Sequence, residues 1–329
     1  MNVRNKLKSM IPSKCSTQIK KIQMLKERKN IDIIEPCKLY NSDGELMHNY
    51  YLCDGAFQLD YSATKGRVPK YIFWDKEKYN LKYHFYTDDM IFTEKGKPDK
   101  KYALLIEPET LQPKKYKTIL TDTSRFLEYD AIFTHSERVL NALPNAKPVI
   151  IGGVYVGTSY GGGTIDSELY KNKSKNISIV SSNKHMCELH EFRYLLAKKY
   201  EKTGVVDCYG TFNGGKQIKI WESLRDYRYS FAIENNIEPY WITERICNCF
   251  ATMTVPIYLG SPKIGDYFNM DGIICINKND FNNMDKIISQ CNEIDYNRRI
   301  DAIRDNFERV QKFYCLEDWL YNNYKNILP

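Results

Sequence analysis

The chain has 329 residues, of which 43% are hydrophobic and 26 are tyrosines, enough for two domains with cores of their own. Residues 1–30 carry nine Lys and Arg against a single Glu, a charge of +8, whereas the whole chain carries +7. The rest of the chain is therefore close to neutral, which argues against a nucleic-acid-binding groove and for a basic arm.

Cysteine usage and hydropathy bear on the compartment. The ten Cys show no C-x-x-C spacing, so we expect reduced thiols rather than disulfides. No apolar run is long enough to span a bilayer and no signal peptide is visible, so the sequence predicts a soluble, cytoplasmic protein. A metal site of the D-x-D kind is not expected, since that triplet does not occur.

The basic arm, residues 1–30, begins with a short amphipathic pattern. Val3, Leu7, Met10 and Ile11 fall on one helical face and the basic residues lie elsewhere. Such a helix could make weak contact with an anionic membrane surface. The alternative is an ordinary solvated or packed N-terminal helix.

Residues 31–165 read as an N-terminal α/β domain. Short strands and turns come first, and residues 102–106 (YALLI) indicate a buried strand that ends at Glu107-Pro108-Glu109. A carboxylate at the C-terminal end of a strand, facing a cleft, is well placed to act as a general base. Residues 129–134 (YDAIFT) indicate the next strand.

The glycine-rich residues 147–176 hold the predicted domain boundary, as linker and cleft wall. A second domain is expected over residues 172–312, beginning with a strand at 177–181, a helix at 189–200 that contains Arg193, and a strand at 205–209. The following loop, residues 211–216 (TFNGGK), could wrap a phosphate with Lys216 as its charge. Residues 313–329 are expected to form a final helix that could pack back on the first domain.

Residues 229–277 predict strand, loop, helix, strand, loop and strand. The loops between parallel strands meet at the ligand-binding edge of a sheet, and here they carry Glu234, Asn235, Thr243, Glu244 and Arg245. Amides at a helix N-terminus and a nearby Arg favour a phosphorylated ligand, while a glutamate would bind hydroxyls. The alternative is a capped helix with a solvated Glu-Arg pair.

The same stretch resembles a known family. FAIENN, YWITER and VPIYLGSP, in this order and spacing, are similar to the signature of the α-1,3/1,4-fucosyltransferases, glycosyltransferase family 10. Arg245 stands where that family usually has Lys, and Trp241 where it usually has Tyr. In the first half, LLIE followed by YDAIFT resembles the strand pair that carries the family's proposed base, which assigns this role to Glu107, with Glu109 as the second choice.

The resemblance implies a GT-B-type fold, with two Rossmann-like α/β domains facing across a cleft. Residues 31–165 would then form the acceptor-side domain and residues 172–312 the domain that binds the nucleotide-sugar donor. It implies an inverting, metal-independent hexosyltransferase without a cofactor, moving L-fucose from GDP-fucose to a hydroxyl of an N-acetylglucosamine or glucose type of glycan acceptor, with α-1,3-like linkage. It also favours a soluble bacterial or viral type over a Golgi-anchored one. The donor-binding residues that it implies are Arg193, Lys216, Glu234, Asn235, Tyr240, Trp241, Thr243, Glu244 and Arg245.

Two other readings stay open at this point. The fold could use another nucleotide-sugar donor, since Trp241 and Arg245 alter the donor loop. The chain could also be a non-catalytic relative that binds glycans or membranes, although the intact Glu234-Asn235 and Thr243-Glu244 pairs speak against it.

Overall fold

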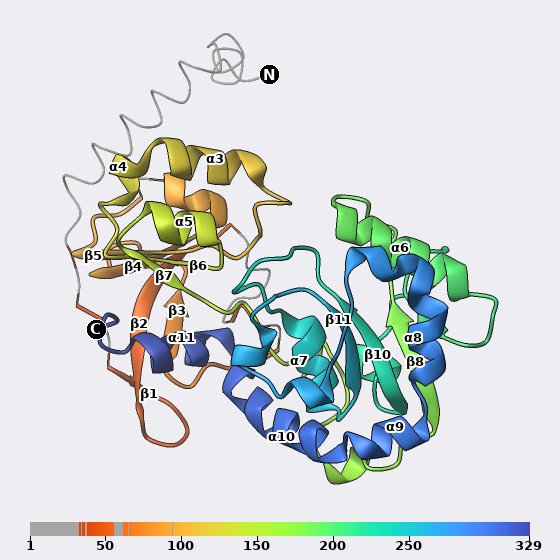
Figure 1. The fold of residues 1–329 in the computed structure, drawn as a ribbon. Coiled ribbons are helices and arrows are strands. Elements are labelled where there is room, and N and C mark those ends of the chain that lie inside the picture. The colour runs from red at the N-terminus through yellow and green to blue at the C-terminus, as the bar shows by residue number, and fades with distance from the viewer. Residues whose placement is uncertain (1–32, 34, 37, 56–61, 65, 94) are drawn as a thin grey trace, which may run out of the picture.

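The protein is described by a computed structural model that covers residues 33, 35–36, 38–55, 62–64, 66–93 and 95–329. The basic arm and its amphipathic pattern lie outside these residues. The described chain forms two α/β sheets that lie side by side, each with helices on both faces (Figure 1). No helix in this part of the chain is long and apolar enough to cross a membrane.

The first sheet has the strand order β1-β2-β4-β5-β6-β7, with β3 paired to β2. All of its described pairs are parallel except β1 with β2. Its strands are β1 (Leu39–Tyr40), β2 (Leu46–Cys53), β3 (Ile72–Asp75), β4 (Tyr83–Thr87), β5 (Lys100–Leu104), β6 (Ala131–Thr134) and β7 (Ala146–Pro148). The helices α3 (Pro113–Thr121), α4 (Thr123–Phe126) and α5 (Glu137–Ala142) cover one face.

The second sheet is wholly parallel, in the order β12-β11-β10-β8-β9. It consists of β8 (Lys175–Val180), β9 (Asp207–Tyr209), β10 (Tyr227–Ile233), β11 (Val255–Leu259) and β12 (Ile274–Cys275). On one face pack α6 (Glu188–Tyr200), α8 (Met284–Gln290) and α9 (Glu293–Arg298), and on the other α7 (Glu244–Ala251), while α10 (Ile300–Val310) contributes to both cores. The central β10 is buried along nearly its whole length, as expected of a parallel strand covered on both faces.

The last helix, α11 (Leu316–Tyr324), belongs to the core of the first sheet. Leu316, Leu320 and Leu328 pack with Phe85 and Phe133 on the face opposite α3 and α5. Figure 1 shows α11 beneath the first domain, although it directly follows the second domain in the chain. The first domain is thus built from two separate parts of the sequence.

The glycine-rich segment after β7 is packed rather than loose. Val149, Ile150, Val154 and Val156 are each at most 1% exposed, and the last two join the core beneath α7. The side-chain oxygen of Asn248 in α7 accepts hydrogen bonds from two consecutive amides of this segment, at 2.9 and 3.0 Å. Residues 149–156 therefore form a buried strap between the two domains.

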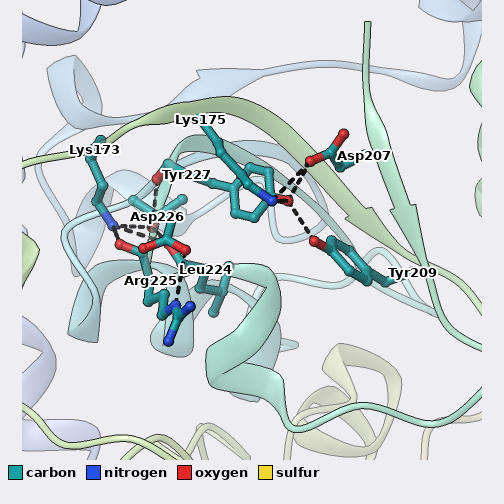
Figure 2. Close-up of polar contacts among 9 residues, drawn as sticks. Lys173, Lys175, Asp207, Tyr209, Leu224, Arg225, Asp226 and Tyr227 are labelled. Atoms are coloured by element: carbon teal, nitrogen blue, oxygen red, sulfur yellow. Dashed lines mark hydrogen bonds and ion pairs between the residues drawn. The ribbon is translucent and has the colours of Figure 1, made fainter. Parts of the chain in front are cut away.

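A buried lysine ties the start of the second domain to its sheet. The ammonium of Lys173 donates to the carbonyls of Leu224 and Arg225 at 3.0 and 2.9 Å (Figure 2). It also donates to the carbonyl of Thr252 at 2.6 Å. These carbonyls lie just beyond a short 3₁₀ turn (Ile220–Ser223) and the C-terminal end of the helix α7. Lys173 thus ties together the segments that lead into the N-terminal ends of β8, β10 and β11.

Candidate active site

A cavity of about 960 Å³ opens between the two domains at the C-terminal ends of the strands. Its first-domain wall includes residues 62–64, Ile106, Glu107, Leu111 and Gln112, and the strap contributes Ile151 and Tyr155. Its second-domain wall includes residues 180–184, His190, Arg193, Asn235, Trp241 and residues 243–245. Parallel α/β sheets bind ligands at this edge.

The N-terminus of α7 forms one end of the cavity. Thr243 is the N-cap, and its hydroxyl oxygen accepts the amide hydrogen of Arg245 at 3.3 Å. The guanidinium of Arg245 lies 3.3 Å from a carboxylate oxygen of Glu244 and 3.6 Å from one of Glu234. Although burial lowers the pKa of Arg245, these carboxylates outweigh it and raise that pKa above its ordinary value. A permanent cation is therefore held in place at a helix N-terminus.

Glu234 does not line the cavity, contrary to the expectation that it faces the ligand. It is fully buried, and its two oxygens accept from the amide and the hydroxyl of Thr243 at 3.1 and 2.7 Å. Burial raises the pKa of Glu234 to about 7, against the opposing effect of Arg245. Its place in the site is behind the helix terminus, where it orients Thr243.

Arg193 adds to the cationic wall from α6. Arg193 is 6% exposed and donates to the carbonyl of Ile233, the last residue of β10, at 2.7 Å. Burial and the neighbouring Arg245 lower the pKa of Arg193 to about 9, so it stays charged at neutral pH. Two guanidiniums close enough to repel each other create a site for a multiply charged anion.

His190 was missed by the sequence reasoning. It is 5% exposed, lines the cavity, and its Nδ1 has no hydrogen-bond partner among the described residues. Burial and the charges of Arg193 and Arg245 lower the pKa of His190 to about 4, so the imidazole is neutral. Its position one turn before Arg193 on α6 is the only signal that the sequence offered.

The loop between β10 and α7 supplies three further buried polar atoms without partners in the described chain. They are the side-chain oxygen of Asn235, the side-chain nitrogen of Asn236 and the indole nitrogen of Trp241, and of these residues Asn235 and Trp241 line the cavity. Buried polar atoms of this kind are rare in folded proteins unless a ligand or water completes them. Tyr240, also expected in the donor site, lies outside the cavity wall, with its ring 5.2 Å from the ammonium of Lys263.

Glu107 faces the cavity from the first domain, three residues beyond the end of β5. Burial raises the pKa of its carboxyl, and the nearby carboxylate of Asp88 adds to that rise. Glu244 in the second domain raises it further, whereas Lys115 and Lys184 lower it. A carboxylate with a raised pKa is a better proton acceptor at neutral pH than an ordinary glutamate.

Two predicted residues lie elsewhere. Glu109 is absent from the cavity wall, and its carboxylate forms an ion pair with Arg138 of α5. Lys216 is exposed on the glycine-rich loop, whose next residues, Gln217 and Ile218, are the ones that reach the cavity. The structure thus places Glu107 and Arg245, rather than Glu109 and Lys216, in the wall of the cavity.

The two domains touch at the rim of the cavity. His135, fully buried after β6, lies 3.4 Å from a carboxylate oxygen of Glu238, and its ring centroid lies 4.4 Å from that of Trp241. The hydroxyl of Thr110 donates to the backbone oxygen of Asn235 at 3.4 Å. These contacts set the spacing between Glu107 on one side and the arginines on the other.

Comparison with known proteins shows which family the second domain resembles. Residues 170–313 match the model of the family described as glycosyltransferase family 10 (fucosyltransferase), C-terminal part. The second domain is therefore similar to the C-terminal domain of this family. The resemblance seen in FAIENN, YWITER and VPIYLGSP is thereby confirmed, because all three segments lie within the match.

Curated relatives align over shorter stretches. An α-(1,3)-fucosyltransferase FucT of Helicobacter pylori is 34% identical over 67 residues, which is 20% of this chain and 14% of that protein. A putative fucosyltransferase-like protein of Arabidopsis thaliana is 29% identical over 84 residues, 25% of this chain and 16% of that protein. The alignments therefore span only about a seventh of the length of these relatives.

Solved structures agree over most of the chain. A crystal structure of an α1,3-fucosyltransferase with GDP covers 89% of this chain and 93% of its own, at a TM-score of 0.50 and 13% identity. The trehalose-6-phosphate synthase OtsA covers 76% of this chain and 72% of its own, at a TM-score of 0.52 and 11% identity. The GT-B-type fold expected from the sequence is confirmed.

Proposed function

We propose that this protein is a fucosyltransferase that moves L-fucose from GDP-fucose to a hydroxyl of a glycan acceptor. The observation that carries the proposal is that a group of cations and a carboxylate lie on opposite walls of one cavity. Arg193, Arg245 and the N-terminus of α7 lie in the domain that resembles family 10, and Glu107 enters from the opposite domain. A transferase that moves a sugar from a phosphorylated donor to a neutral hydroxyl needs cations to bind the phosphates and a base to accept the hydroxyl proton.

The donor's diphosphate would bind at the cationic end. Arg245 is held by Thr243, Glu234 and Glu244, so its guanidinium needs little reorganisation when a phosphate arrives. Glu244 is the side chain there that can accept hydrogen bonds from ribose or sugar hydroxyls. The solved α1,3-fucosyltransferase with GDP supports a guanosine diphosphate as the ligand.

The reaction that this geometry supports is a single displacement. Glu107 accepts the proton of the acceptor hydroxyl as its oxygen bonds to the anomeric carbon, through an oxocarbenium-like state. The bond from that carbon to the phosphate oxygen breaks, and GDP leaves with the electron pair. Attack from the face opposite the leaving group inverts the configuration. The two arginines would stabilise the leaving diphosphate without requiring a metal ion.

A second candidate is the same chemistry with another nucleotide sugar. Trp241 stands where family 10 usually has Tyr, and its indole nitrogen is a buried donor without a partner among the described residues. That donor is available to a ligand group that differs from the one a tyrosine hydroxyl would meet. Thermal-shift measurements with GDP, UDP and their sugars separate the two candidates, since the stabilising nucleotide identifies the donor.

A matched pair of variants tests the proposed base. Glu107→Gln should lower transfer by two to four decades, because the amide cannot take the proton, while calorimetric GDP binding stays as in the wild type. Glu109→Gln is the control: its carboxylate pairs with Arg138 outside the cavity, so transfer should continue at the wild-type rate. Equal rates for both variants would remove Glu107 from the mechanism. EDTA should leave the wild-type rate unchanged, and its abolition would show that a metal takes part.

A further inference from the structure

Asp88 has a backbone conformation that residues other than glycine rarely adopt. It directly follows β4 and has a backbone φ of 43°, in the left-handed region where glycine is the usual residue. This conformation is strained for a non-glycine residue. The residue is 2% exposed, so solvent contact does not account for its presence. A buried aspartate kept at this position needs a reason in its contacts.

The contacts of Asp88 converge on Glu107. One carboxylate oxygen of Asp88 accepts hydrogen bonds from the amides of Ile106 and Glu107, both at 3.2 Å. The hydroxyl of Tyr116 in α3 donates to the carbonyl of Glu107 at 2.8 Å. The amide of Glu107 is thus held by Asp88 and its carbonyl by Tyr116, while its side chain faces the cavity.

The same carboxylate oxygen forms an ion pair with Lys115, the neighbour of Tyr116 in α3. Both side chains are at most 3% exposed, so solvent screens this pair weakly. Burial raises the pKa of Asp88, and the ammonium of Lys115 opposes that rise. An ion pair this deeply buried is seldom a net source of stability, which points to a role beyond holding the fold.

We propose that the Asp88–Lys115 pair is a positioning device that fixes the Glu107 backbone and sets the electrostatic field around its carboxylate. This inference rests on the proposed function, because it gives the device its purpose. The pair presents to Glu107 one negative charge from the 3₁₀ turn that follows β4 and one positive charge from α3. The other charged groups that face Glu107 are Glu244 of α7 and Lys184 of the loop after β8.

Removing the charge of Asp88 and removing that of Lys115 should shift the pKa of Glu107 in opposite directions. In Asp88→Asn the shape and the acceptor for both amides remain, but Lys115 becomes an uncompensated cation that favours the ionised form of Glu107. In Lys115→Met the carboxylate of Asp88 is left alone and disfavours that form. The pKa of Glu107 should therefore fall by about one unit in the first variant and rise by about one in the second.

The decisive measurement is a titration of Glu107 by NMR of the side-chain ¹³C carboxyl signal, assigned with Glu107→Gln. Opposite displacements in Asp88→Asn and Lys115→Met, and a return towards the wild-type value in the double variant, support the proposal. Displacements of the same sign, or none in the variants that fold, overturn it. Asp88→Asn suffices if Lys115→Met does not fold, since an unchanged or raised Glu107 pKa contradicts the proposal.

Backbone positioning has its own readout. The amides of Ile106 and Glu107 should exchange with solvent faster in Asp88→Ala than in Asp88→Asn, because only the latter keeps the acceptor. Equal exchange in these two variants would remove the positioning role. Neither measurement needs an acceptor substrate. If the wild type transfers no sugar, the proposed function is wrong. The titration and the exchange rates still test whether the Asp88–Lys115 pair positions Glu107 and sets its pKa.

The activity of Asp88→Asn supplies a third readout. Its kcat should fall and the acid side of its pH profile should move to lower pH, with the KM for the donor unchanged, because the donor binds in the other domain. A higher donor KM with an unmoved profile would indicate a general structural defect instead.

Discussion

Glu317 offers a test of how the wall of the cavity is held. This glutamate of α11 is 1% exposed. One of its oxygens accepts from the amide of Ala63 at 2.6 Å and the indole nitrogen of Trp74 at 3.0 Å. The other accepts from the hydroxyl of Ser62 at 3.0 Å and the thiol of Cys315 at 3.1 Å. Ser62 and Ala63 line the cavity, so the contacts of Glu317 position them.

The two carboxylate oxygens of Glu317 accept from different kinds of donor, so substitutions at this position should differ in their cost. In Glu317→Ala, two N–H groups that can only donate lose their acceptor, at about 1–3 kcal/mol each, so the unfolding free energy should fall by about 4 kcal/mol. In Glu317→Gln, the amide oxygen can serve both N–H groups, while the amide nitrogen donates to the hydroxyl and the thiol, which also accept. That variant should lose only about 1 kcal/mol, the charge assistance of the bonds.

Urea unfolding followed by circular dichroism measures the difference, and hydrogen exchange locates it. Protection should fall in β2 to β5 for Glu317→Ala and stay unchanged in the second sheet. Glu109→Ala is the control and should change stability by less than about 0.5 kcal/mol, as expected for a side chain in a partly exposed ion pair. If Glu317→Gln destabilises as much as Glu317→Ala, the assignment of donors to the two oxygens is wrong.

Three further outcomes are expected. Arg245→Ala should lower kcat by two decades or more while Lys216→Ala stays near the wild type, since only Arg245 lines the cavity; steady-state kinetics that showed the reverse would relocate the phosphate site. Because burial raises the pKa of Glu107 and a base acts in its deprotonated form, the kcat/KM profile should fall on the acid side at a pH above the range of an ordinary glutamate; a flat profile would argue against this base. His135→Phe removes the polar contacts to Tyr116 and Glu238 and should lower the unfolding free energy by about 1–3 kcal/mol in urea; no change would mean that these contacts contribute nothing.

The second half of the site was predictable because its signal is local. Thr243, Glu244 and Arg245 are consecutive, and a helix start fixes where each of them points. The same reasoning failed for Glu234. It follows a strand buried on both faces, where alternation gives no hint of which side chain meets the ligand, and the structure turns it behind Thr243.

The first half was less predictable because its contacts join distant parts of the chain. The sequence placed Glu107 at a strand end, but Asp88, which holds it, lies 19 residues earlier in the chain. Nothing in the run YTDDM reveals a positive φ or an ion pair with Lys115. Lys216 failed for a related reason, since a glycine-rich loop does not fix the direction of its side chains.

The return of α11 to the first domain has a consequence for the order in which the molecule can assemble. Residues 170–313 are contiguous and can reach their native packing as soon as they are available. The first domain lacks Leu316, Leu320 and Leu328 until the end of the described chain emerges, so one face of its sheet stays bare during synthesis. The first-domain wall, which includes residues 62–64 and Leu316, would thus be the last part of the cavity to form.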